Sequence, residues 1–290
     1  MERGPTDRLH AHLQHLVGER HPATAPQRLR ETESYLVDQF ASLGLAVTTH
    51  PFDALGGIYR NVVATLPAAQ EFLAAPFLIG GHFDTVVGSP GADDNASGLA
   101  VLLEVARRLA GRPLDRPVQF VAFNLEEEDL LGSLAYAAHL RATGQDLHGA
   151  IVFECVGFAR QDEGSQLRPS GVPIPVPSVG NFLAVIGNEH SRSLVESFIA
   201  AASCAVPAMP LVPLIVPGHG EGLPDTRRSD HAAFWEYDYP ALMLTDTANF
   251  RNPHYHQPSD TIETLDFDFM AKVTDAVTAA VCELAGLTKP

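Results

Sequence analysis

Residues 76–86, PFLIGGHFDTV, form an apolar run that ends abruptly in polar side chains. Short apolar runs of this kind predict β-strands that are buried on both faces, as in parallel sheets. His82 and Asp84 stand where the run turns polar. Because ligands of open α/β sheets bind beyond the carboxyl ends of the strands, this junction is the first candidate site.

Strand-like and helix-like segments alternate on both sides of this run. Residues 96–110 repeat apolar side chains at helical spacing, whereas 158–180 are rich in Pro, Gly and Ser and predict a long irregular loop near a site. The alternation predicts an α/β fold: one domain over residues 1–290, with a mixed, mostly parallel central sheet sandwiched by helices. Further strands are expected at about 45–52, 61–67, 117–125, 150–156, 181–188, 209–216 (at an edge, because of its proline) and 240–247, and further helices at about 27–43, 133–140, 192–202 and 267–285.

The composition narrows the classes of function. The 35 acidic and 19 basic residues give a net charge of −16, which repels phosphate backbones and argues against a nucleic-acid partner. No apolar run approaches the roughly 18–20 residues of a membrane span, and the polar N-terminus lacks the apolar core of a signal peptide. The three cysteines are odd in number and widely spaced, so we expect no disulfide framework and a cytoplasmic location. Nothing in the sequence fixes the oligomeric state.

Metal-binding side chains follow other expected strands as well. Each of these side chains could also have a purely structural role without a metal. Aspartates can cap a helix, an acidic run can be solvated, and a buried glutamate can form a salt bridge. Consecutive acids repel one another, however, and a buried carboxylate without a partner is costly, so a bound cation would stabilise both. These candidates are Asp93 and Asp94 before the 96–110 helix, the run EEED at 126–129, Glu154, His254 and His256.

Five separated motifs, met in order along the chain, resemble those of the M28 family of zinc peptidases, the group of co-catalytic aminopeptidases. The resemblance runs from about residue 30 to the C-terminus and implies a zinc-exopeptidase-like fold. Asp129 departs from it, because the family commonly has glycine there. The motifs are GGHFDTV (80–86), PGADDNASG (90–98), EEEDLLGS (126–133), FECVG (153–157) and NPHYHQPSDT (252–261).

The resemblance implies two Zn2+ ions per chain. One would be held by His82, Glu154 and a bridging Asp93, and the other by Glu127, His256 and the same Asp93. The family pattern also implies a cis peptide bond between Asp93 and Asp94. The expected catalytic residues are Glu126 as general base, Asp84 as the acid that orients His82, and Tyr255 as a donor to the oxyanion, although Tyr255 can also be read as a packed loop aromatic.

The expected reaction is hydrolysis of an amide bond by a water between the two metals, with removal of N-terminal amino acids from peptides. The substrate is a peptide or a small acylated amine, and residues 158–180 are either a wall of its side-chain pocket or an exposed connector. Two alternatives remain open: a glutaminyl-cyclase-like acyltransferase with one zinc, and a non-catalytic binding domain on the same fold. The adjacent residues Ser229, Asp230 and His231 are a poor catalytic triad, since triad side chains must converge in space.

Overall fold

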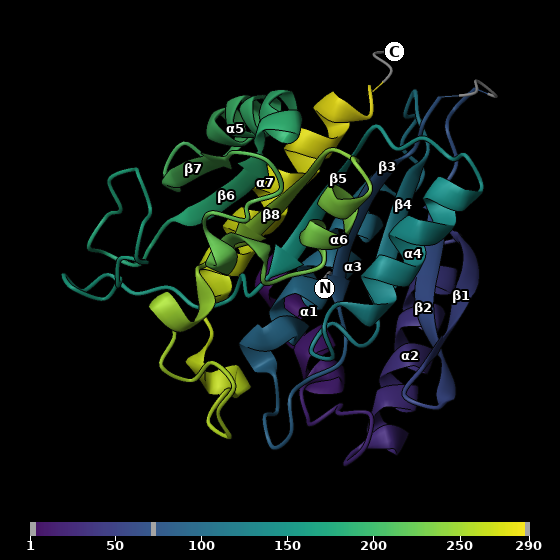
Figure 1. Ribbon diagram of the computed structural model, residues 1–290, viewed down its shortest axis with the longest axis horizontal. Helices are drawn as coiled ribbons and strands as arrows, with labels where there is room; N and C mark the ends of the chain where they lie inside the picture. Colours follow the sequence, from purple (N-terminus) through teal and green to yellow (C-terminus); the bar gives the residue numbers. More distant parts are fainter. Residues whose placement is uncertain (1–3, 71–73, 288–290) are drawn as a thin grey trace.

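Four parallel strands form the centre of the sheet and bring the candidate residues to one edge. The computed structural model describes residues 4–70 and 74–287, so the ends of the expected domain, 1–3 and 288–290, lie outside the described residues. All strands of the described part belong to one sheet with the order β1-β2-β4-β3-β5-β8-β6-β7 (Figure 1). The strands are β1 (Ala46–Ala54), β2 (Gly57–Leu66), β3 (Phe77–His82), β4 (Val118–Phe123), β5 (Gly149–Glu154), β6 (Leu183–Asn188), β7 (Leu211–Val216) and β8 (Ala241–Thr245).

The register of the central strands explains why distant residues meet. Strand β3 runs parallel to β4 and β5, and β5 runs parallel to β8. His82 is the last residue of β3 and pairs with Phe123 at the end of β4, while Glu154 at the end of β5 pairs with Thr245 of β8. The carboxyl ends therefore lie side by side, where open α/β sheets place their ligands.

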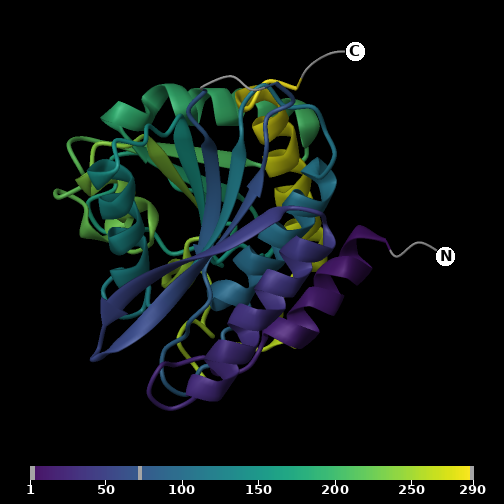
Figure 2. The same ribbon diagram turned by 90° about the vertical axis from the view of Figure 1, so that its right-hand side faces the viewer.

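Helices cover both faces of this sheet, as Figure 2 shows from the side. On one face, α4 (Leu131–Ala142) and α6 (His231–Glu236) bury Tyr136, Leu140 and Trp235 against the strands. The second face has a larger core beneath five helices. These are α1 (Pro5–Leu16), α2 (Pro26–Ser42), α3 (Gly98–Leu109), α5 (Arg192–Ala205) and α7 (Phe267–Leu284). The expected mixed, mostly parallel sheet between helices is confirmed.

The expected strands and helices are all present, with ends shifted by a few residues. Two helices were not expected, α1 and the short α6. Among the described strands, β7 pairs only with β6 and is an edge strand, as its Pro213 predicted. Residues 158–180 contain neither helix nor strand, also as predicted. Short helical turns complete the chain: a π-helical turn at Ala92–Ser97 and 3-10 turns at Glu189–Ser191, Pro224–Arg227, Ala248–Phe250 and Ile262–Thr264.

Among the described residues, no helix combines the length and the apolar character that crossing a membrane requires.

Candidate metal centre

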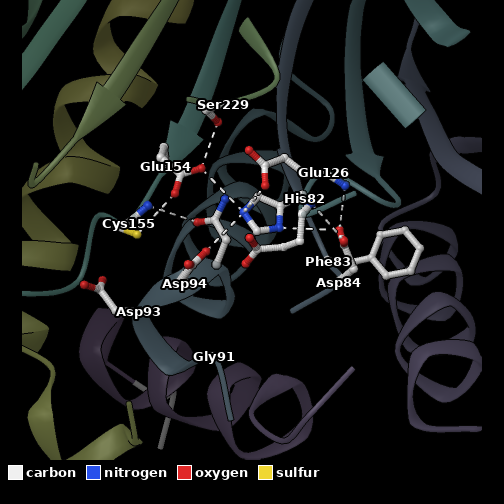
Figure 3. Close-up of polar contacts among 12 residues, drawn as sticks. His82, Phe83, Asp84, Gly91, Asp93, Asp94, Glu126, Glu154, Cys155 and Ser229 are labelled. Carbon is white, nitrogen blue, oxygen red and sulfur yellow. Dashed lines mark hydrogen bonds and ion pairs between the residues drawn. The ribbon is translucent and has the colours of Figure 1, made fainter. Parts of the chain in front are cut away.

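His82 lies among four carboxylates at the carboxyl end of β3. Its Nε2 atom is 3.2 Å from Asp94 Oδ1, 3.4 Å from Glu154 Oε2 and 3.8 Å from Glu126 Oε2 (Figure 3). Its Nδ1 atom is 3.5 Å from Asp84 Oδ1, an ion-pair distance without hydrogen-bond geometry. The imidazole is completely buried, so these acids face it away from bulk solvent.

Asp94 joins this cluster to a second histidine. Its other oxygen, Oδ2, lies 3.0 Å from His256 Nε2, and that nitrogen is 3.3 Å from Glu127 Oε2. One carboxylate thus presents one oxygen to His82 and the other to His256. This is the arrangement of a carboxylate that bridges two cations.

The structure does not bring Asp93, the predicted bridge between the metals, into these donor groups. Figure 3 shows the Asp93 side chain apart from His82. Its Oδ1 accepts a hydrogen bond from the Gly157 N–H (2.8 Å) and its Oδ2 accepts one from Asn252 Nδ2 (2.7 Å). The cis peptide bond also lies one residue later than expected, between Asp94 and Asn95.

The backbone explains this one-residue difference. Residues 92–97 form a π-helical turn in which Asp94 has extended dihedral angles (φ −105°, ψ 93°), so the two neighbouring side chains leave in different directions. The N–H groups of Asp93 and Asp94 both donate to the carboxylate of Asp260, at 2.9 and 3.2 Å. Asp260 belongs to the motif at 252–261, but the sequence predicts no role for it. The spacing of the motif predicts neither this turn nor the contact with Asp260.

Asp84 contacts the segment that carries the predicted base. Its two oxygens accept the backbone N–H groups of Glu126 (3.0 Å) and Glu127 (3.1 Å), while Oδ1 faces His82. The acid expected to orient His82 therefore faces that histidine at an ion-pair distance and also holds the backbone of the glutamate pair. Glu128, which belongs to neither expected ligand set, pairs with His21 at 3.3 Å.

The loop between β4 and α4 turns sharply to present these glutamates. Asp129 adopts a left-handed conformation (φ 61°), which glycine adopts freely. Aspartate is therefore accommodated here only with local strain. At Gly132 a Cβ atom would lie 2.0 Å from the carbonyl oxygen of Asn124, so only glycine fits. Asn61 of β2, which sequence reasoning missed, fixes the same loop: it accepts from the Asn124 N–H (3.0 Å) and donates to the Gly132 carbonyl (2.8 Å).

Glu154 reaches the cluster with the help of a serine. Ser229 Oγ donates to Glu154 Oε2 at 2.8 Å, and Cys155 Sγ lies 3.3 Å from Glu154 Oε1. The neighbours of Ser229 have other surroundings: His231 Nε2 contacts the Thr226 carbonyl, and burial raises the pKa of Asp230 to about 7. The three adjacent residues therefore do not form a triad, in agreement with the prediction.

The titration of the cluster reflects an excess of carboxylates over imidazoles. Burial would lower the pKa of His256, but Asp94 and Glu127 outweigh it and raise that pKa to about 10. Burial, reinforced by Asp94, raises the pKa of Glu127 to about 7. Burial also raises the pKa of Glu126 well above its usual value. His82 opposes this shift, whereas Glu154 and Glu127 reinforce it by repelling the charge of Glu126. A divalent cation would relieve this repulsion by taking the place of bound protons.

The donor atoms fit a metal on geometric grounds. Among the described residues, both ring nitrogens of His82, both oxygens of Asp94, Glu127 Oε1 and His256 Nε2 are buried without a hydrogen-bond partner. Nitrogen and carboxylate oxygen donors of this kind suit zinc. Three groups have donor atoms that all lie within 4.8 Å of one another: His82–Asp94–Glu154, Asp94–Glu127–His256 and His82–Glu126–Glu127. The first two are the expected ligand sets with Asp94 in place of Asp93.

A cavity of about 420 Å3 opens beside this cluster. Glu154 and Tyr255 form part of its wall, and residues 169–172 of the irregular loop form another part. The Tyr255 ring stacks on His256 with centroids 3.9 Å apart, and its hydroxyl accepts a hydrogen bond from Arg228 at 3.2 Å. The apolar part of the lining comprises Val172, Ile186, Leu214, Leu223, Met243 and Phe250.

The sequence pattern of peptidase family M28 matches residues 61–281. The chain belongs to peptidase family M28. Among curated proteins, it is 33% identical over 287 residues to uncharacterized protein YfbL of Escherichia coli (strain K12), covering 93% of this chain and 86% of that protein. It is 28% identical to leucine aminopeptidase 1 of Trichophyton equinum over 79% of this chain, which spans only 58% of that relative.

Several solved structures share the fold of this M28 peptidase. The LapA aminopeptidase fold of Legionella pneumophila matches with a TM-score of 0.77 at 22% identity, over 97% of this chain and 73% of that one. Glutaminyl cyclase of Porphyromonas gingivalis matches with a TM-score of 0.70 at 20% identity, over 96% of each chain. The zinc aminopeptidase BSAP of Bacillus subtilis matches at 26% identity with a TM-score of 0.60, over 79% of this chain and 51% of that one.

Proposed function

We propose that this M28 peptidase is a zinc-dependent aminopeptidase with two zinc ions per chain. The observation that carries the proposal is the position of Asp94, with one oxygen 3.2 Å from His82 and the other 3.0 Å from His256. One ion would be held by His82, Glu154 and Asp94, and the other by Glu127, His256 and Asp94. When bound, two zinc ions would polarise a carbonyl group and make a water nucleophilic near neutral pH.

The residues around the metals divide the remaining chemistry between them. Glu126 is buried beside His82 without being needed in either ligand set, so its carboxylate is free to take a proton from water and to return it to the leaving amine. The raised pKa of Glu126 makes its carboxylate a stronger proton acceptor than that of a solvated glutamate. Tyr255 lies on the cavity wall, where its hydroxyl can donate to the oxygen of the attacked carbonyl.

The cavity supports a peptide substrate that begins with a large apolar residue. Its apolar lining adjoins Glu154, so a side chain in the cavity would place its own backbone at the metal cluster. The surplus of carboxylates at the cluster would attract the ammonium group of a free N-terminus. Residues 169–172 line this cavity, which supports a wall rather than a bare connector as the role of the irregular loop.

A glutaminyl-cyclase-like acyltransferase with one zinc is the second candidate, because a cyclase shares the fold. The two histidine-containing ligand groups that meet at Asp94 favour two metals. A non-catalytic binding domain is less well supported, since both ligand sets and the candidate base are present. We also propose that the chain acts as a single metallopeptidase domain. Because its three cysteines are free, we propose a reducing, cytoplasmic location.

A panel of aminoacyl-p-nitroanilides with zinc-loaded protein tests the function. We expect the fastest release of nitroaniline from leucyl and phenylalanyl substrates, and loss of that activity in EDTA. Glu126→Gln should retain zinc and the fold but lose nearly all turnover, whereas Glu128→Gln, which alters the neighbouring acid outside the ligand sets, should retain it. EDTA-resistant activity, or full activity of Glu126→Gln, would contradict the proposal.

A further inference from the structure

Arg20 is a completely buried cation in the segment between α1 and α2. Its guanidinium group donates to carbonyl oxygens rather than to a carboxylate. A buried charge is tolerated only where its donors are satisfied, and here five separate contacts do so. The acceptors are the carbonyls of Phe83 (2.7 Å), Leu16 (2.6 Å), Gly18 (2.8 Å), Pro90 (2.9 Å) and Gly91 (3.0 Å).

These contacts reach both sides of the metal cluster. Phe83 directly follows His82, and Gly91 stands three residues before Asp94. The Arg20 N–H also donates to Thr85 Oγ1 at 2.8 Å. One side chain therefore joins the segment that leaves the first histidine to the segment that delivers the bridging aspartate.

Gly91 shows how closely this junction is packed. It has a left-handed conformation (φ 62°), and a Cβ atom there would lie 2.3 Å from the Asp94 carbonyl, 2.4 Å from Thr85 Cγ2 and 2.8 Å from Arg20 Nη2. The guanidinium group thus contacts the backbone of the Asp94 turn without room for an intervening atom. A change in the position of Arg20 would be transmitted to that turn.

The positive charge of Arg20 interacts electrostatically with nearby acids of the metal cluster. Burial lowers its pKa to about 10, and the negative groups that oppose this shift are Asp94, Asp84 and Asp260. Asp260 in turn accepts a hydrogen bond from the N–H of Asp94. A permanent positive charge here would hold these carboxylates together before any metal binds.

We propose that Arg20 is a positioning residue of the metal centre, which fixes His82 and Asp94 relative to each other through the backbone on either side of them. This inference rests on the proposed zinc binding and adds to it a residue that lies outside the matched region, 61–281. Lysine cannot replace it, because a single ammonium group cannot donate in the fixed fork that reaches both segments.

The test compares Arg20→Lys and Arg20→Met with Arg28→Met as a matched control. Arg28 also donates to backbone carbonyls of the α1–α2 connection, those of His15 (2.5 Å) and Val17 (3.1 Å), but these carbonyls lie outside the 83–91 segment. Each protein is measured for zinc affinity by chelator competition, for the visible absorption spectrum of its Co2+ form, and for thermal unfolding without metal. The Co2+ spectrum reports ligand geometry, which loss of stability alone would not change.

We expect both Arg20 variants to bind zinc about 10–100-fold more weakly and to show altered Co2+ spectra, the range typical of residues that orient metal ligands. Arg28→Met should lower the unfolding temperature and keep the wild-type spectrum. Wild-type zinc affinity and spectrum in Arg20→Lys would overturn the proposal. If neither Arg20 variant folds, Thr85→Val, which removes the acceptor of the Arg20 N–H, is measured instead. Weaker zinc binding with an altered Co2+ spectrum would support the proposal, and wild-type zinc affinity and spectrum would overturn it. A wild-type protein that binds no zinc would instead refute the proposed function.

Discussion

The carboxylate of Asp84 accepts the backbone N–H of Glu126 at 3.0 Å. The same carboxylate faces His82, so one side chain fixes both a predicted ligand and the predicted base. We predict that Asp84→Asn weakens zinc binding about 10–100-fold and lowers kcat, because the amide NH2 would oppose a backbone N–H. Asp129→Asn is the control, since asparagine tolerates its left-handed conformation. Equal zinc affinity of the Asp84→Asn and wild-type proteins would argue against this role.

The pair Asp94→Asn and Asp93→Asn separates the bridging residue from its neighbour. Asp94→Asn should abolish tight zinc binding, because it removes the charge shared by both ligand sets. Asp93→Asn should retain zinc binding but lower the free energy of unfolding by about 1–3 kcal/mol, since one oxygen that accepts from Gly157 or Asn252 is replaced by a donor. Zinc titration and urea unfolding measure the two effects. The reverse pattern would restore Asp93 as the bridge.

The cavity predicts how substrate preference should change. Val172 is a buried residue of the irregular loop that lines the cavity, so Val172→Phe should fill part of it. We expect kcat/KM for leucyl and phenylalanyl p-nitroanilides to fall about tenfold relative to the alanyl substrate. Val176→Phe is the matched control on the same loop, because Val176 is not among the lining residues. An unchanged preference in Val172→Phe would show that the side chain binds elsewhere.

His12 of α1 predicts sensitivity to acid away from the metal centre. Burial lowers its pKa to about 4 although Glu104 opposes this, and its ring contacts the Tyr35 hydroxyl at 2.8 Å. Between pH 6.5 and 4, the unfolded chain takes up a proton that the folded chain does not, so stability falls as the pH falls through this window. Relative to His12→Gln, the wild-type protein should lose about 3 kcal/mol of unfolding free energy by pH 4. Parallel curves for the two proteins in urea unfolding would contradict this.

Much of the fold could be predicted because its central strands are short apolar runs. Strands β3, β5 and β8 are buried along their whole length, so each appears in the sequence as a nearly continuous apolar run. Helix α1 was not predicted although Leu9, Leu13 and Leu16 have helical spacing, because they stand among polar and charged residues. Its stability comes from packing against α3 and α7, which a local pattern does not contain.

The site could be predicted in part. The histidines and glutamates that the cluster brings together were expected, because each follows a strand end or belongs to a recognised motif. The choice between Asp93 and Asp94 depends on the path of one turn, and adjacent aspartates have the same chemistry. Asn61, Ser229 and Arg20 act through contacts with residues far along the chain, so no spacing rule could have found them.

The number of zinc ions bound per chain tests the two-metal site most directly. Metal-free protein is dialysed against excess zinc, freed of unbound metal and measured for zinc and protein content. Two ions per chain are expected, with the second lost in Asp94→Asn together with the first. A ratio of one in the wild-type protein would support the cyclase-like alternative, and a ratio of zero would contradict a zinc-dependent mechanism altogether.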